Sequence, residues 1–446
     1  MKSALVFSIL VLAFSQKPSL NIAIRNSEVE ELKNQLLPVF LKNMTDMVIP
    51  DMNVNSGSLK CTMSNIHVKL GSLNPKDIHI NFQAGTNTIK SNGEHLSVSV
   101  TCHAKCSYLF ITVEPDVLVN VKEITYAGTV TLGVANQQPS ITLGALTVGI
   151  NPNNMDITFS NTPIKIILDL IVPLFKSTII SQVNSMAAND IPKMVNDIIS
   201  GLMKTIPIDI PFYNGLGVHS VAQRSPLCEN DKLVIYEWSY GVDLKNPKLP
   251  PYQPKDMPDF STCTQGIQVI VSEYIADSIL YAAYNAGLLV DTQEISYEGV
   301  KGTISCVTND VPDFQFKNDV FLKYFGTCEF KGTYNGKAVA VKASGVLNGD
   351  GDMNVKNEKI FFSIQELIPT ITNIISISGM TAAEFQQLIN KYANELENTI
   401  NNGIGKNGID LPMIDGIDYS NSVSAMKMGY MEVCSTPVIN IKKYLE

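Results

Sequence analysis

A proline-rich stretch near the middle of the chain constrains the fold more than any other feature. Five prolines fall within the thirteen residues 246–258. Because proline lacks a backbone donor and restricts φ, neither a helix nor an inner strand can run through such a stretch. It therefore predicts an extended, semi-rigid connector that works as the hinge of a two-part chain.

Helical and strand-like patterns follow each other in the same order on both sides of this connector. Long helical patterns cover 28–48 and 164–203 before it, and 272–289 and 365–400 after it, with strand-like segments between them. The shared order predicts a duplication of about 200 residues, longer than the short repeats of solenoid proteins. We expect one domain at 16–245, a linker at 246–260 and a second domain at 261–446.

The N-terminus has the pattern of a secretory signal peptide. Lys2 supplies a positive charge, residues 4–14 form a short apolar run, and Ala13-Phe14-Ser15 is a cleavage site of the small-x-small type. The apolar run is too short to span a bilayer. We expect residues 1–15 to be removed and the mature protein to be secreted and extracellular.

Composition and charge exclude some classes of partner. With 446 residues, 45% of them hydrophobic, the chain can build two sizeable cores. Its net charge is −9, and Arg25 and Arg224 are its only arginines. A nucleic-acid binder needs a basic surface, which this composition does not provide. Charge alone would not hold the protein on an anionic membrane either.

Eight cysteines in a secreted chain favour disulfides over metal ligands or nucleophiles. The candidate pairs are Cys306 with Cys328, which would close a short loop, and Cys228 with Cys263, which would tie together the ends of the connector region. Eight cysteines allow 105 pairings, so these two pairs stay hypotheses and one or two free thiols are compatible with the sequence. A zinc site from Cys61, Cys102, His103 and Cys106 is a weaker alternative, because its spacing is unlike that of common zinc ribbons.

Strand patterns with a period of two fill residues 49–159. Examples are Ile66-x-Val68-x-Leu70 and Leu96-x-Val98-x-Val100, separated by turns rich in glycine and asparagine. Each such strand has one apolar face, so the strands must wrap around something apolar. The glycine-rich segment 348–352 predicts a hairpin tip. It resembles a calcium loop only superficially, because Met353 and Lys359 replace the required glycine and glutamate.

The start of the second half carries a resemblance to a known family. Residues 271–278 read Val-Ser-Glu-Tyr-Ile-Ala-Asp-Ser, run on to Ala-Gly-Leu-Leu at 286–289, and directly follow the proline-rich connector. Together with Ile-Pro-Asp at 49–51 and Ile-Asp-Leu-Pro at 409–412, this resembles the family of bactericidal/permeability-increasing protein. That family includes lipopolysaccharide-binding protein and the phospholipid and cholesteryl ester transfer proteins.

The resemblance implies an α+β fold of two tandem tubular lipid-binding domains in a boomerang arrangement. Each domain would be a highly twisted antiparallel sheet wrapped around a long helix, with an apolar lipid pocket. Two features depart from the family. Residues 164–203 contain no cysteine for the usual disulfide of the first domain, and residues 101–107 offer one lysine and one histidine where lipopolysaccharide-binding members are cationic.

The apolar seams of the helical patterns are the candidate lipid-binding residues. Each of them either lines a pocket or packs in an ordinary core, and core packing is the commoner role for any single residue. The candidates are Leu36, Phe40, Ile167, Leu170, Leu174, Ile275, Ile279 and Ala283. Asn43, in the triplet Asn-Met-Thr, is the candidate glycosylation site.

Catalytic motifs do not support an enzyme. The chain has no Gly-x-Ser-x-Gly, no His-Glu-x-x-His and no phosphate loop, and only five histidines. We therefore expect a lipid-binding or lipid-transfer protein that carries phospholipid-like ligands, uses no metal or cofactor, and meets a membrane or lipoprotein surface transiently. The alternative is an innate-defence protein that binds bacterial lipopolysaccharide, which would need a basic patch.

Overall fold

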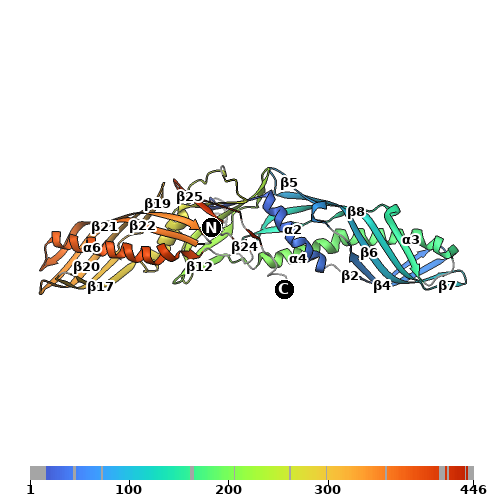
Figure 1. Cartoon of the computed structure of the whole chain (residues 1–446). Coiled ribbons are helices and arrows are strands. Elements are labelled where there is room, and N and C mark those ends of the chain that lie inside the picture. The colour runs from blue at the N-terminus through green and yellow to red at the C-terminus, as the bar shows by residue number, and fades with distance from the viewer. Residues whose placement is uncertain are drawn as a thin grey trace, which may run out of the picture.

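The computed structural model describes residues 17–43, 47–71, 74–160, 165–204, 206–260, 263–297, 299–356, 359–410, 417–418, 421–436 and 438–439. Over these residues the protein is an elongated, sheet-rich α+β molecule (Figure 1). The expected signal peptide lies outside them. Among the helices so described, none combines the length and the apolar character that a membrane span needs.

A central antiparallel sheet joins the two ends of the molecule. Its strand order is β12-β13-β15-β1-β16-β26-β25, and β14 pairs with β15. β1 lies between β15, which precedes the connector, and β16, which follows it. The bounds are β12 Asp209–Tyr213, β13 Leu216–Ala222, β15 Lys232–Asp243, β1 Leu20–Arg25, β16 Ile267–Ser272, β26 Tyr430–Ser435, β25 Val423–Lys427 and β14 Leu227–Cys228.

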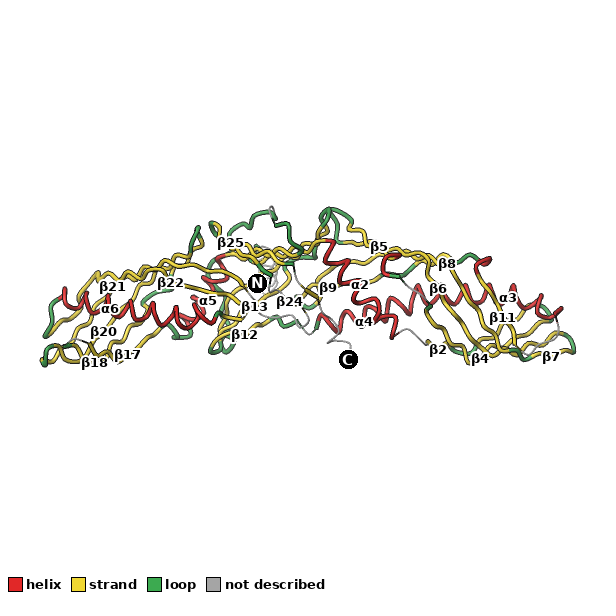
Figure 2. The backbone as a smooth tube through the Cα atoms, viewed as in Figure 1, coloured by secondary structure: helices red, strands yellow, loops and turns green. Residues whose placement is uncertain are grey.

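A second antiparallel sheet forms the end built from the first half of the chain, where helices α3 and α4 run along it (Figure 2). Its long strands are β6 and β8, and β4 pairs with β6. The bounds are β2 Met47–Ile49, β3 Met52–Ser56, β4 Leu59–Leu70, β5 Ile78–Phe82, β6 Thr88–Tyr108, β7 Ile111–Val113, β8 Asp116–Ala135, β9 Gln138–Leu143, β10 Thr147–Gly149 and β11 Met155–Ser160. The helices are α2 Asn26–Asn43, α3 Lys165–Ser185 and α4 Ile191–Met203.

A third antiparallel sheet forms the other end and packs on α6 (Figure 1). Its order is β17-β18-β20-β21-β22-β23, and β19 pairs with β20. The bounds are β17 Val290–Tyr297, β18 Val300–Thr308, β19 Asp313–Phe316, β20 Val320–Tyr334, β21 Lys337–Lys356, β22 Lys359–Ser378 and β23 Ile409–Asp410. The remaining elements are α5 Glu273–Asn285, α6 Ala382–Ile400 and the pair β24 Ile417–Asp418 with β27 Val438–Ile439.

The helical pattern expected at 164–203 is confirmed as two helices. A π-helical turn over Met186–Asp190 joins α3 to α4, just before Pro192. Pro173 lies inside α3 without ending it. The break therefore comes at the second of the two prolines and not at both.

Two expectations for the second half are wrong. Residues 365–378 belong to strand β22, and the helix begins only at Ala382, where Thr381 and Glu384 form a capping box. The isoleucines and threonines of this segment favour a strand, and the capping box marks the true helix start. Residues 348–352 are not a hairpin tip but the middle of β21, paired with both neighbours. At Gly351 a Cβ atom would lie 2.4 Å from the carbonyl oxygen of Ser363, so glycine permits close strand packing there.

Of the two expected disulfides, one is confirmed and one is wrong. Cys306 is bonded to Cys328, as expected, but Cys263 is bonded to Cys434 and Cys228 is a free thiol. Cys228 is buried against Ile89 and Leu132 of the second sheet, away from Cys263. The pairing of β16 with β26 places Cys434 opposite Gln268, which brings Cys434 close to Cys263 just before β16. A third bond joins Cys61 to Cys106, which removes both residues from the zinc site considered above.

The connector forms no helix or strand over 246–260, as its prolines predict. It is nevertheless firmly attached to the central sheet and to α5. The ring of Tyr252 contacts Tyr274 edge-on at 5.7 Å, and Lys255 bonds to Glu273. At its end, the guanidinium of Arg25 donates to the carbonyl of Cys263 at 2.7 Å. Because β1 also hydrogen-bonds across the junction, the connector is a strap over a continuous sheet and not a free hinge.

A carboxyl group under this strap has a perturbed pKa. Burial, helped by the nearby charges of Glu273 and Asp313, raises the pKa of Asp277 to about 7. The backbone N–H of Phe314, which donates to Asp277 at 3.2 Å, and the ammonium group of Lys255 oppose this shift only in part. The native state therefore holds a proton on Asp277 at a pH where the unfolded chain has released it.

We expect this group to make the protein less stable as the pH rises. An acid whose pKa is higher in the folded state stabilises that state fully below pH 4, and the effect is lost as the pH rises to about 7. Asp277→Asn cannot ionise but can still accept the bond from Phe314. Its free energy of unfolding should exceed that of the parent by about 2–4 kcal/mol at pH 8 and match it near pH 4. Urea unfolding at both pH values measures this, and an equal difference at both would contradict it.

Candidate functional site

The interior of the first-half sheet is filled by α3. Ile171 and Phe175 are fully buried there, and the ring of Phe159 on β11 meets that of Phe175 edge-on at 6.0 Å. Leu174, one of the expected pocket residues, is half-buried and packs on the edge of this cluster. Leu170, another, is 43% exposed. The described part of α3 therefore serves mainly as core.

Four candidates cannot be placed. Leu36, Phe40 and Ile167 lie in α2 and α3, but their side chains are outside the described part of the structure. The same holds for the glycosylation candidate Asn43, the last residue of α2. Their roles stay predictions from the sequence.

The three candidates on α5 pack against the central sheet. A Cβ atom on Gly241 of β15 would lie 2.3 Å from the backbone nitrogen of Ile279, so helix and strand touch backbone to backbone. Ala283 is buried in a small cluster with Leu216, and Ile275 is half-buried. The small residues of α5 thus permit this close approach of the helix to β15. These three residues lie on α5 in the second half of the chain, whereas Leu170 and Leu174 lie on α3 in the first half.

One face of the central sheet is apolar and only half-buried. Ile22 lies directly across from Ile235 on one side and from Val269 on the other, so all three side chains project from the same face. Their neighbours two residues along each strand extend the surface. We call this surface the aliphatic face; it consists of Ile22, Ile24, Leu233, Ile235, Ile267 and Val269, each half-buried.

The opposite face of the same strands is closed at its middle. Ala23, Val234 and Ile270, which alternate with residues of the aliphatic face, are at most 3% exposed. The six residues of the aliphatic face are less buried than these three, although Leu233 at its edge packs against the cluster of Ile89 and Leu132. An aliphatic surface that keeps partial exposure inside a folded protein is suited to an apolar ligand.

A half-buried carboxyl group stands at the end of the aliphatic face. Glu237 lies across from Leu20 on that face, and the hydroxyl of Ser220 donates to it at 2.5 Å. Burial raises the pKa of Glu237, and the bond from Ser220 offsets this only in part. The face therefore combines a wide apolar surface with one polar group, which is the composition typical of sites for amphiphilic ligands.

An apolar hairpin turn stands at the far end of the first-half sheet. β6 and β7 pair through Tyr108 and Ile111, which leaves Leu109 and Phe110 as the turn. Leu109 is 67% exposed, Phe110 is 98% exposed and Ile111 is 44% exposed. Leu109 has a φ of 53°, a conformation that is costly for a leucine and normally taken by glycine or asparagine. We call these three residues the apolar tip; β7 lies at one end of the molecule in Figure 1.

Sequence reasoning missed both surfaces for identifiable reasons. The alternation Leu-Asn-Ile-Ala-Ile at 20–24 was a usable signal for a strand with one apolar face, but it is short and lies next to the signal peptide. No sequence pattern marked residues 109–111, the apolar tip, as a turn. Leu-Phe-Ile at 109–111 reads as part of a strand until the turn is known, because turns are normally recognised by glycine or asparagine.

Comparison with known proteins agrees with this description. No protein-family model and no curated protein sequence matches the chain. Among solved structures, lipopolysaccharide binding protein superposes with a TM-score of 0.57 at 14% identity, over 95% of this chain and 99% of that one. This chain has the fold of lipopolysaccharide binding protein. The α+β fold expected from the family resemblance is thus confirmed over almost the full length.

Two further structures are similar at lower scores. Takeout 1 of Epiphyas postvittana gives a TM-score of 0.27 at 16% identity, over 40% of this chain and 88% of that one. P47 of Clostridium botulinum E1 gives a TM-score of 0.30 at 7% identity, over 94% and 99%. Of these three structures, lipopolysaccharide binding protein is the one similar enough to support an argument about the fold.

Proposed function

We propose that the protein is a secreted lipid carrier that binds phospholipid-like ligands without covalent catalysis. In this proposal, residues 16–245 and 261–446 are two tubular lipid-binding domains, joined through the strap at 246–260 in a boomerang arrangement, and each holds an apolar pocket. The observation that supports it most is the aliphatic face, with Ile22 and its neighbours half-buried opposite the buried residues Ala23, Val234 and Ile270.

The energetics of acyl-chain burial are sufficient for such a role. Each buried methylene contributes about 0.8 kcal/mol, so a chain of about fifteen carbons contributes on the order of 10 kcal/mol. Part of this is lost to ordering of the chain and to desolvation of the headgroup. The remainder still supports a ligand that stays bound until the protein meets another lipid surface.

The apolar tip supports transient contact with a membrane or lipoprotein surface. Phe110 exposes nearly its whole side chain, and Ser107 and Thr112 beside the turn are uncharged. The nearest cations in the strand register are Lys60 and Lys105, and Lys105 is paired with Glu114. A tip of this kind favours insertion between neutral headgroups. It offers little to the polyanionic lipopolysaccharide of the alternative function.

Mass spectrometry of organic extracts tests the proposal. The full-length protein is purified from a secreting host, and its extract is compared with that of an unrelated secreted protein prepared in the same way. We expect a stoichiometric lipid load, close to two molecules per chain if both domains are occupied. An extract equal to the control, together with no uptake of labelled phosphatidylcholine from vesicles, would refute a carrier function.

A further inference from the structure

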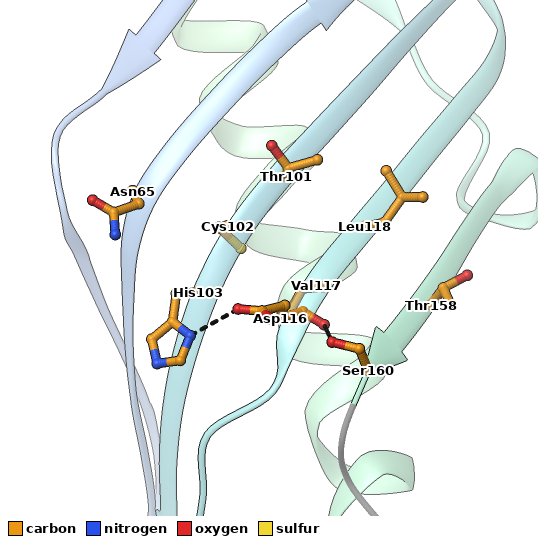
Figure 3. Close-up of a pocket in the computed structure, with 9 residues that line it drawn as sticks. All are labelled: Asn65, Thr101, Cys102, His103, Asp116, Val117, Leu118, Thr158 and Ser160. Atoms are coloured by element: carbon orange, nitrogen blue, oxygen red, sulfur yellow. Dashed lines mark hydrogen bonds and ion pairs between the residues drawn. The ribbon is translucent and has the colours of Figure 1, made fainter.

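A hollow on the outer face of the first-half sheet is not explained by lipid carriage. Its volume is about 470 Å³, within the roughly 300–1,000 Å³ of small-molecule sites. Figure 3 shows the residues that line it along neighbouring strands of the sheet, with a helix behind. Two cross-strand rows form its floor, Thr101-Leu118-Thr158 and His103-Asp116-Ser160. Cys102 and Val117, which alternate with them, belong to the core on the other face.

A β-bulge shapes one side of this hollow. The pairing of β4 with β6 shifts register between Ser64 and His67, and Asn65 inside the shift has a φ of 52°. Bulges of this kind commonly redirect a side chain toward a site. The exposed amide of Asn65 borders the hollow beside His103 (Figure 3).

The charges around the hollow restrict its ligand. No lysine or arginine is found among the described residues that line it, so it is not suited to a phosphate or another anion. Among its described lining residues Asp116 is the one carboxylate, and it is bonded at 2.9 Å to Nδ1 of His103; one carboxylate and one imidazole are too few ligands for a metal cation. The remaining groups around the side chain of Leu118 are the amide of Asn65, the imidazole edge and the hydroxyls of two threonines and Ser160, of which Ser160 already donates to the carbonyl of Asp116 at 3.3 Å.

This chemistry matches a small neutral polyol. Hydroxyl and amide groups pair well with the hydroxyls of such a ligand, and the second oxygen of Asp116 can accept from them. Leu118 and the methyl groups of Thr101 and Thr158 offer an apolar floor to the C–H face of a ring. We propose that this hollow binds the ring of a neutral saccharide, either free or as the headgroup of a glycolipid.

Saturation-transfer NMR on the full-length protein tests this proposal. The probes are methyl glycosides of mannose, galactose and N-acetylglucosamine. We expect at least one to bind saturably and Asp116→Asn to weaken it about tenfold, because the charged acceptor is lost. Asn65→Gly, which keeps the left-handed backbone and removes only the amide, should also weaken binding. No saturable binding by any of the three, in solution or on vesicles, would overturn the proposal.

A matched control lies on the same two strands. Glu123 of β8 pairs with His95 of β6 outside the hollow, at 2.5 Å. Glu123→Gln removes a similar exposed pair and should leave saccharide binding within twofold of the parent. Equal losses in Glu123→Gln and Asp116→Asn would assign the effect to sheet stability and contradict the site.

A second comparison distinguishes the two sources of the ring. Phosphatidylcholine vesicles that carry a glycolipid with the preferred sugar are compared with the free glycoside. If the protein binds the glycolipid vesicles more tightly than the free glycoside, by more than its affinity for plain vesicles explains, the ligand is a glycolipid headgroup. If it binds both equally tightly, the ligand is a free glycan. None of these readouts depends on carried lipid, so an empty lipid extract would refute the carrier function and leave the saccharide site standing.

Discussion

Phe110→Asp is expected to reduce binding to phosphatidylcholine vesicles by at least tenfold. Phe110 is 98% exposed at the end of the molecule, and its insertion into a bilayer would contribute about 1.5–3 kcal/mol. The substitution removes this favourable insertion free energy and places a negative charge at the same position. Vesicle flotation measures the bound fraction. Since the tip is apolar, binding by the parent should change little between low and high salt, in contrast to a cationic tip.

The opposite end of the molecule provides the control for this prediction. The turn between β20 and β21 is Asn335-Gly336, with φ values of 50° and 78°, which are typical of a polar hairpin turn. Asn335→Asp adds the same charge there in a conformation that aspartate tolerates. Vesicle binding should be unchanged. If Phe110→Asp binds as the parent does, or if both variants lose binding equally, the tip is not the membrane contact.

Val269→Trp is expected to displace carried lipid without destabilising the protein. Val269 lies in the middle of the aliphatic face, across from Ile22 and Val433, and is half-buried. If an acyl chain occupies the space beside it, an indole ring can fill that space instead. The lipid extracted per chain should then fall by about half, because one of the two proposed pockets is blocked, while the melting temperature stays the same or rises.

Ile270 is the matched control for this substitution. It is the next residue on β16, points to the closed face and is 1% exposed. Ile270→Trp overpacks a filled core and should cost about 1–3 kcal/mol or more of stability, with little effect on the lipid carried by the folded fraction. If Val269→Trp behaves like Ile270→Trp, the aliphatic face is ordinary core and the carrier proposal loses its main support.

Local patterns in the sequence were enough to predict several elements. The prolines of 246–258 forbid regular structure whatever their surroundings, and the structure has none there. Ser272 caps α5 through the N–H of Tyr274, because a serine before an apolar helical seam satisfies a free backbone donor in any context. The pair Cys306–Cys328 follows from two neighbouring strands, β18 and β20, that place these residues opposite each other.

Long-range pairing decided the rest. Cys263 meets Cys434 only because β16 pairs with β26, strands separated by more than 150 residues. Residues 348–352 became mid-strand because β20 and β22 pair with them on both sides, which a local glycine signal cannot show. The connector became a strap because β1 inserts between β15 and β16.

For the proposed functional surfaces, too, part could be predicted from the sequence and part depended on the tertiary structure. The sequence by itself determined that strands with one apolar face had to enclose something apolar, since alternation at a period of two is a local property. Which faces are closed, as at Ile270, and which stay half-buried, as at Val269, was decided only by the tertiary structure. Burial depends on what packs against a side chain, and those neighbours come from distant parts of the chain.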